Sequence, residues 1–157
     1  MRRLALLCGT VVLVACAKTD VDTKADSAAM APPDAMAPAA LALADIAGRW
    51  TVRVMPEMGD STLLTYELTA TGDTNGWSIK FPDRAETVPV RVMNVAGDSV
   101  MIETGPYQSA LQKGVNVSTN GAWRMDSGKL VGRMTAHYAV PTADSVRVLR
   151  MEGTRIQ

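Results

Sequence analysis

The feature that most constrains the fold is an alternation of apolar and polar residues that starts near residue 48 and recurs to the end of the chain. Trp50, Val52 and Val54 lie at every second position, with polar residues between them. Successive side chains of a β-strand point to opposite faces, so this period of two predicts strands with one buried and one solvated face. The clearest examples are residues 48–55, 62–70, 77–81 and 88–93.

Further strands are predicted after these, separated by residues typical of tight turns. The additional strands are residues 99–103, 115–125, 129–138 and 144–154. The turn signals are Gly59-Asp60, Gly72-Asp73, Asn75-Gly76, Gly97-Asp98, Ser127-Gly128 and Pro141. Such residues supply positive φ angles or local side-chain bonds at reversals. Residues 104–114 form one longer link, in which Pro106 and Gly114 predict the start and stop of a short helix.

Eight strands joined in this way predict an all-β fold, an antiparallel meander. Closing the meander into a barrel pairs every strand edge, so an eight-stranded barrel is the simplest solution. A sandwich of two sheets is the rival fold. The predicted domain covers residues 45–157, which suffice for one hydrophobic core and not for two.

The N-terminus has the pattern of a secretory signal peptide. Arg2 and Arg3 precede an apolar run over residues 4–15. Basic residues stay on the cytoplasmic side while such a run enters the membrane. The run is shorter than the roughly 20 residues that a spanning helix needs, and Lys18 and Asp20 follow it closely. Residues 1–15 are therefore predicted to be a leader and not a permanent anchor.

The end of this run, Leu13-Val14-Ala15-Cys16, resembles the lipobox of bacterial lipoproteins. The resemblance implies that Cys16 is acylated and becomes the first residue of the mature chain, which its acyl chains then hold firmly in a membrane. In such families an Asp after the Cys tends to retain the protein in the inner membrane, so Ala17 favours the outer membrane. The expected location is the cell envelope, lipid-anchored and facing the periplasm, with the cell exterior as the alternative. An ordinary cleaved signal with an incidental Cys is the competing interpretation.

Composition excludes several classes of function. Cys8 lies in the leader and Cys16 is the acylation site, so the mature chain has no thiol left for a disulfide and depends on its own core. Removing Arg2 and Arg3 from the 16 basic residues leaves 14 against 16 acidic ones, a formal net charge of −2. That balance argues against nucleic-acid binding. With one His and no free Cys, neither a metal site nor a cofactor is expected.

Residues 16–44 differ in composition from the rest of the chain. They are rich in Ala, Pro, Asp and Met and contain no aromatic residue. Such a segment buries too little apolar surface to offset the entropy of ordering it. It is predicted to be a flexible tether, with a turn or two of helix at residues 39–44 as the alternative.

Gly48-Arg49-Trp50, at the start of the first predicted strand, resembles the Gly-x-Trp motif that opens lipocalins and related calycin barrels. The resemblance implies a calycin-like barrel whose base is closed by Trp50 and a basic side chain of the last strand. A guanidinium over an indole is worth about 0.5–2 kcal/mol. Arg150 is expected to be that partner, because it shares a strand face with Val148, and Arg155 is the alternative.

Tyr66, Trp77 and Phe81 lie on adjacent predicted strands and are the candidates for a wall of an apolar ligand site. Packing in the core is the alternative role for all three. A small barrel encloses a ligand or is filled by its own side chains, and the sequence leaves both possibilities open.

No catalytic group is predicted. His137 is expected to face solvent beside Arg133 and Thr135, and the spacing suggests neither a nucleophile nor an orienting carboxylate in reach. A Gly-x-Ser-x-Gly motif is absent. Asp73-Thr74-Asn75-Gly76 lacks the later Glu of a calcium loop and is predicted to be a hairpin turn.

These features predict a non-enzymatic envelope lipoprotein whose barrel binds or carries a small apolar ligand. The alternative is a protein-binding module with a filled barrel, such as a periplasmic protease inhibitor or an envelope scaffold. The pattern resembles periplasmic metalloprotease inhibitors, which are eight-stranded barrels that also open with Gly-x-Trp. An accessible cavity favours the carrier, and a solid interior favours the protein-binding module.

Overall fold

The computed structural model describes residues 40–157 of the chain. The predicted signal peptide, the predicted acylation site Cys16 and residues 16–39 of the predicted tether lie outside the described residues. Within residues 40–157, no helix is long and apolar enough to cross a membrane. The strands share one hydrophobic core of their own, which is the condition for a domain that folds by itself.

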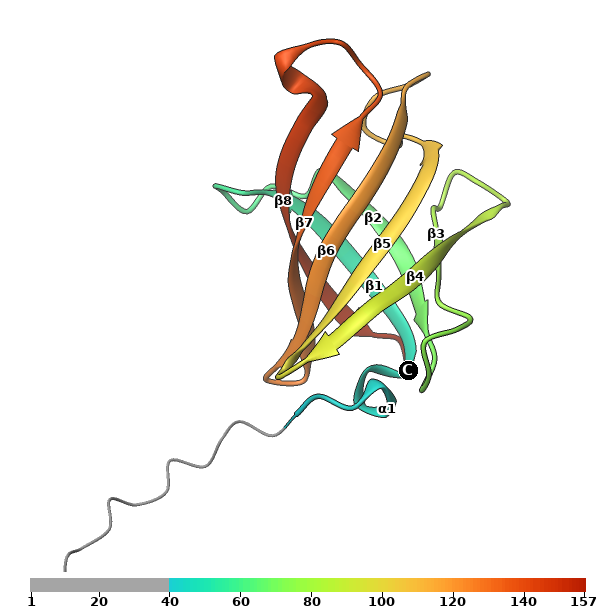
Figure 1. Ribbon diagram of the computed structural model, residues 1–157, viewed down its shortest axis with the longest axis vertical. Helices are drawn as coiled ribbons and strands as arrows, with labels where there is room; N and C mark the ends of the chain where they lie inside the picture. The colour runs from blue at the N-terminus through green and yellow to red at the C-terminus, as the bar shows by residue number, and fades with distance from the viewer. Residues whose placement is uncertain (1–39) are drawn as a thin grey trace, which may run out of the picture. The chain divides into compact units, whose positions relative to one another are not determined.

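Eight antiparallel strands close into a barrel, each paired with the next and the last paired with the first (Figure 1). The strands are β1 (Gly48–Pro56), β2 (Leu64–Ala70), β3 (Ser78–Lys80), β4 (Thr87–Ala96), β5 (Ser99–Gln108), β6 (Asn116–Asp126), β7 (Lys129–Tyr138) and β8 (Val146–Arg155). A short helix, α1 (Leu43–Ile46), precedes them, and a 3-10 helix, η1 (Ala143–Ser145), precedes β8. The prediction of an all-β, closed eight-stranded barrel is confirmed, and the two-sheet sandwich is wrong.

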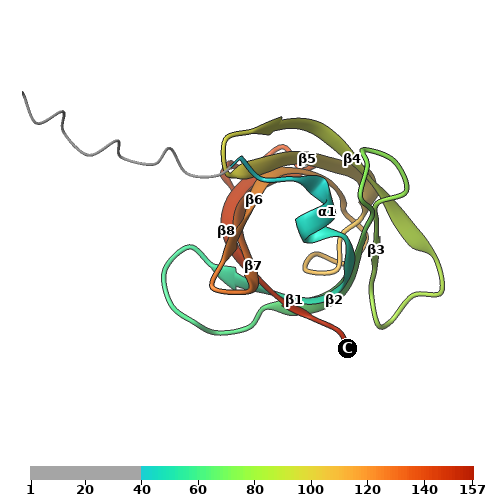
Figure 2. The same ribbon diagram turned by 90° about the horizontal axis from the view of Figure 1, so that it is seen from below.

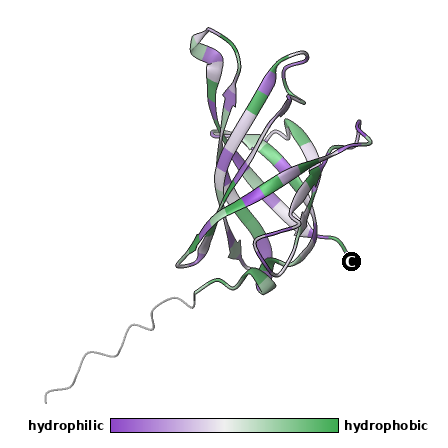
Figure 3. Ribbon diagram, turned by 45° about the vertical axis from the view of Figure 1, so that its right-hand side comes forward, coloured by the Kyte–Doolittle hydropathy of each residue, from purple (hydrophilic) through white to green (hydrophobic). Residues whose placement is uncertain are grey.

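The alternation in the sequence becomes an inner and an outer face of the barrel wall. Trp50, Val52 and Val54 of β1 are fully buried, while the residues between them are exposed. Figure 3 shows the same alternation as bands of opposite hydropathy along the strands. The core is therefore the barrel interior, as the period of two predicts.

The two ends of the barrel differ in their connections. At one end, which we call the base, α1 lies across the opening of the barrel (Figure 2). Two tight hairpins join β4 to β5 and β6 to β7 there, and a longer link joins β2 to β3. Ser127 and Gly128 make one of these hairpins with φ angles of 51° and 79°, the left-handed pair that suits a two-residue turn. At the other end, the open end, longer links join β1 to β2, β3 to β4, β5 to β6 and β7 to β8.

The predicted helix in residues 104–114 does not form. Strand β5 instead continues to Gln108, across a register shift between Thr104 and Tyr107. Gly105 lies in this shift with φ of 108°, and a Cβ there would come within 2.7 Å of the Val117 carbonyl oxygen. Only glycine fits this close approach of two strands, so Gly105 and Pro106 extend the wall in place of starting a helix.

Strand β3 is shorter than the predicted strand over residues 77–81. It pairs with β2 only from Glu67 to Thr69, which leaves Leu64–Tyr66 of β2 without a strand partner on that side. The residue after β3, Phe81, begins the link to β4. The barrel wall is thus interrupted beside Phe81, near the open end.

Candidate functional site

Two small cavities lie inside the barrel near its open end, each of about 20 Å³. A buried water needs about 10–15 Å³ measured in this way, so each cavity has room for roughly one water. The side chains that line both cavities are Leu64, Phe81, Tyr107, Thr119 and Met134. We call the two together the open-end cavities, and these five residues border both of them.

An aromatic row crosses the open-end cavities. The rings of Tyr66 and Phe81 meet edge-on with centroids 5.8 Å apart, and Phe81 lies 5.7 Å from Tyr107. Tyr66 and Phe81 are two of the three predicted candidates for a ligand wall, and both are buried. Tyr107 was not among those candidates, because it lies in the link that was predicted as a helix.

Trp77 does not line either cavity. It lies at the base, where its Nε1 donates a hydrogen bond of 2.9 Å to the Asp73 carbonyl, and its own carbonyl accepts one from the Val90 N–H at 3.0 Å. Phe81 lies four positions after Trp77 along the chain, a span of roughly 13 Å if the chain is extended. The three predicted aromatic residues are therefore all buried in the core, but only Tyr66 and Phe81 line a cavity together.

The phenols of this region are neutral at ordinary pH. Burial raises the pKa of Tyr66 far above its usual range, and the neighbouring Tyr107 adds to the effect. Burial raises the pKa of Tyr107 to about 12, against a smaller lowering by its hydrogen bond to Thr119. Tyr66 donates its hydroxyl to the Met151 sulfur at 3.5 Å, a weak acceptor. The lining thus offers polar groups without charge.

One hydroxyl in the lining has no partner. Thr104 is 2% exposed, and its Oγ1 forms no hydrogen bond with any of residues 40–157. It lines the cavity that Tyr66 and Phe81 also line. Leaving a buried hydroxyl unpaired costs about 1–3 kcal/mol, so this position is suited to a polar atom of a bound molecule.

Tyr66 and Phe81 also line a hollow on the outside of the barrel. This hollow measures about 280 Å³ and lies over the interrupted wall beside β3. Its other lining residues are Thr51, Thr65, Glu67, Lys80 and Pro82. Tyr66 and Phe81 therefore border both the outer hollow and a cavity inside the barrel.

The base is closed by Trp50 and Arg155. The Arg155 Cζ lies 4.3 Å from the centroid of the Trp50 ring, and Arg155 also donates hydrogen bonds to the carbonyls of Asp45, at 2.8 Å, and of Ala47. The Trp50 Nε1 donates to the Ile46 carbonyl at 2.7 Å. The guanidinium and the indole thus tie α1 to the barrel.

The prediction that Arg150 is the partner of Trp50 is wrong. Leu149 and Met151 on either side of it are buried, so Arg150 points out of the barrel. It donates to Asp60 at 2.8 Å in the link between β1 and β2. The strand register places Arg155, the alternative, opposite Trp50.

His137 and Asp73 each have a polar partner nearby in the barrel. His137 is exposed on β7 as predicted, and its Nε2 lies 2.9 Å from the Asn120 side-chain oxygen. In the link between β2 and β3, the Asp73 carboxylate accepts the Asn75 N–H at 2.6 Å, as expected of a turn. Residues 40–157 contain no group of three or more His, Cys, Asp and Glu side chains arranged to hold a metal ion.

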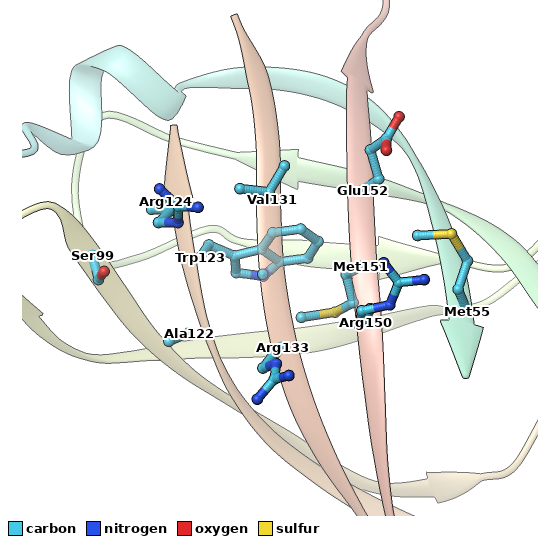
Figure 4. A pocket seen from close by; sticks show the side chains of 11 residues that line it. Met55, Ser99, Ala122, Trp123, Arg124, Val131, Arg133, Arg150, Met151 and Glu152 are labelled. Carbon is cyan, nitrogen blue, oxygen red and sulfur yellow. The ribbon is translucent and has the colours of Figure 1, made fainter. Parts of the chain in front are cut away.

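Larger hollows lie on the outer face of the barrel. One of about 410 Å³ crosses β6, β7 and β8, and three arginines surround it (Figure 4). Their ion pairs are Arg124–Asp126 at 3.5 Å, Arg133–Glu57 at 3.6 Å and Arg150–Asp60 at 2.8 Å. The arginine charges are therefore balanced by nearby carboxylates.

A second outer hollow, of about 440 Å³, is more apolar. It is lined by Met93 and Met101, which are 57% and 48% exposed, and by Ala122 between the two hollows. Met93 and Met101 are the most exposed large apolar side chains in the lining of either hollow.

Comparisons of the chain with protein-family models, with curated proteins and with solved structures found no match. The closed eight-stranded antiparallel barrel is compatible with a lipocalin-like fold.

Proposed function

We propose that the protein is a non-enzymatic envelope lipoprotein, anchored through Cys16, whose barrel binds a small apolar ligand at its open end. The observation that carries the proposal is the pair of open-end cavities, which share five lining side chains, among them Phe81, Tyr107 and Met134. A closed barrel is consistent with a binding barrel of this kind.

Binding requires these side chains to move. Pockets for drug-sized ligands typically measure about 300–1,000 Å³, far above the 20 Å³ of each open-end cavity. Phe81 lies in a link and not in a strand, and Met134 has a flexible, unbranched side chain. Both side chains border both cavities, and Phe81 also borders the outer hollow beside β3, so their displacement enlarges the space open to a ligand.

The open end also contains a polar group that a ligand satisfies. The unpaired Thr104 hydroxyl donates to or accepts from a hydroxyl or carbonyl of a molecule in the cavity. Because the neighbouring phenols are neutral, the interior suits an uncharged, mainly apolar group.

The test is a search for bound lipid followed by titration. Residues 17–157 are purified and extracted, the extract is examined by mass spectrometry, and the protein is then titrated with decanol by calorimetry. We expect saturable binding of one molecule per chain. Absence of both bound lipid and measurable binding across alcohols of several chain lengths contradicts the proposal.

A protein-binding module is the second candidate, because the interior is nearly filled and the outer face carries the exposed Met93 and Met101. This function is tested by pull-down from membranes with the tagged lipoprotein and with a Met93→Glu, Met101→Glu variant. A partner that the variant loses supports this candidate, and equal capture by both proteins rejects the methionine surface as the docking site.

A further inference from the structure

Two guanidinium groups lie over aromatic rings at the open end. The Arg84 Cζ is 5.0 Å from the centroid of the Phe81 ring, and the Arg147 Cζ is 5.8 Å from that of Tyr138. Phe81 contacts Tyr107, and all three rings line one of the open-end cavities. We call Arg84 and Arg147 the rim arginines, since they stand above the aromatic lining.

Several N–H groups of the rim arginines form no hydrogen bond with residues 40–157. Arg84 donates to the Gln108 carbonyl, and its nearest carboxylate, the exposed Asp83, is 3.9 Å away without a hydrogen bond. Arg147 has no ion pair or side-chain hydrogen bond with the part of the chain from residue 40 onward. A guanidinium carries five N–H donors, so both groups retain several for a further acceptor.

Two arginines on the outer wall of the barrel are engaged more fully than the rim arginines. Arg49 binds both oxygens of Glu67 at 2.8 Å, and Arg91 donates to Glu103 at 2.7 Å. Both of these pairs lie on the outer face of the wall, away from the cavities. The rim arginines differ from these two in standing over aromatic rings that line a cavity.

We propose that the ligand of the barrel is a single-chain anionic amphiphile, whose carboxylate lies on the rim arginines and whose hydrocarbon chain enters between Phe81 and Tyr107. This inference rests on the proposed function. A planar guanidinium binds a carboxylate through two parallel hydrogen bonds. The interior lining has no cation to receive the charge, and burying an unpaired carboxylate is costly, so the head group stays at the rim.

The experiment compares ligands that share a ten-carbon chain and differ only in the head group. Residues 17–157 are titrated by calorimetry with decanoate, decanol and decyltrimethylammonium, each below its micelle concentration. The proteins are the unchanged sequence, Arg84→Gln, Arg147→Gln and the control Arg91→Gln, which removes a guanidinium from the outer face. Thermal unfolding of every variant checks that the barrel is intact.

We expect decanoate to bind at least about tenfold more tightly than decanol, and decyltrimethylammonium to bind more weakly than either. Arg84→Gln and Arg147→Gln reduce the affinity for decanoate and leave that for decanol unchanged, while Arg91→Gln changes neither. Equal binding of decanoate and decanol in all four proteins overturns the anionic head group but retains the apolar site. Failure of all three ligands to bind overturns the proposed function as well.

Discussion

The base and the open end of the same barrel are built in different ways. At the base, Trp50 and Trp77 are buried and each donates its indole N–H to a backbone carbonyl. The helix α1 covers this end, and the Leu41 N–H fastens the chain before it to the Gly97 carbonyl at 2.8 Å. At the open end, the Thr104 hydroxyl is unpaired and side chains leave two cavities between them.

This difference makes the base the more stable end of the barrel and the open end the more adaptable one. A base with filled space and paired polar groups resists change, because any displacement loses packing and hydrogen bonds together. The open end loses less when its side chains move, and local opening is generally found in such regions. Trp123, on β6, departs from this division, since it is fully buried while its Nε1 has no partner within residues 40–157.

The largest effect is expected from removing the indole at the base. Trp50→Ala should lower the free energy of unfolding by about 3–5 kcal/mol, the usual cost of deleting a large core aromatic. Denaturant unfolding measures it, with the exposed Val148→Ala as the control. A loss of about 1 kcal/mol or less would show that the base does not carry the stability assigned to it.

Phe81→Ala tests how much a buried aromatic residue at the open end contributes to the free energy of unfolding. Phe81 is also buried, yet it borders existing cavities and a flexible link, so we expect a smaller loss of about 2 kcal/mol. The enlarged space should also tighten the binding of decanol. Unfolding and calorimetry on one protein sample measure both effects. A loss as large as that of Trp50→Ala, without tighter binding, removes the contrast between the two ends.

Arg155→Gln sharpens the assignment of the base partner. It removes the contact with Trp50 and hydrogen bonds to two carbonyls, for an expected loss of about 1–2 kcal/mol. Arg150→Gln, on the outer face, is the matched control and should cost less than about 1 kcal/mol. The reverse order of the two losses contradicts the assignment.

Thr104→Val is expected to have the smallest effect and the opposite sign. Replacing the unpaired hydroxyl by a methyl group of similar size should raise the free energy of unfolding by roughly 1 kcal/mol. Thr119→Val, which removes a hydroxyl bonded to Tyr107, should give no such gain. Thermal unfolding compares them, and a destabilised Thr104→Val would mean that its hydroxyl is satisfied.

Much of the fold could be predicted because it depends on local pattern. Period-two alternation and turn residues located the strands, and the strand Lys129–Tyr138 has the predicted bounds. Closure followed from the need to pair edges. The Gly-x-Trp motif placed Trp50 correctly at the base, where α1 and the last strand meet it.

The remaining features depend on tertiary contacts that local pattern does not contain. Val146 and Val148 are apolar yet exposed, so they indicated the wrong inner face for β8 and hence Arg150 as the partner. Gly105 was predicted to lie in a link, because its close approach to Val117 involves a distant strand. That error also hid Tyr107, whose alternation with Thr104 is broken by the register shift.

The most direct test of an adaptable ligand site at the open end is methionine-methyl NMR during titration of residues 17–157 with decanoate. Met134 and Met151 line the open-end cavities, and each also borders one outer hollow: Met134 the hollow lined by Met93 and Met101, and Met151 the hollow lined by Met55. Saturable shifts of the Met134 and Met151 methyl signals, with Met55, Met93 and Met101 unchanged, are the predicted result. Shifts confined to Met93 and Met101 would place binding on the outside of a filled barrel and contradict the assignment.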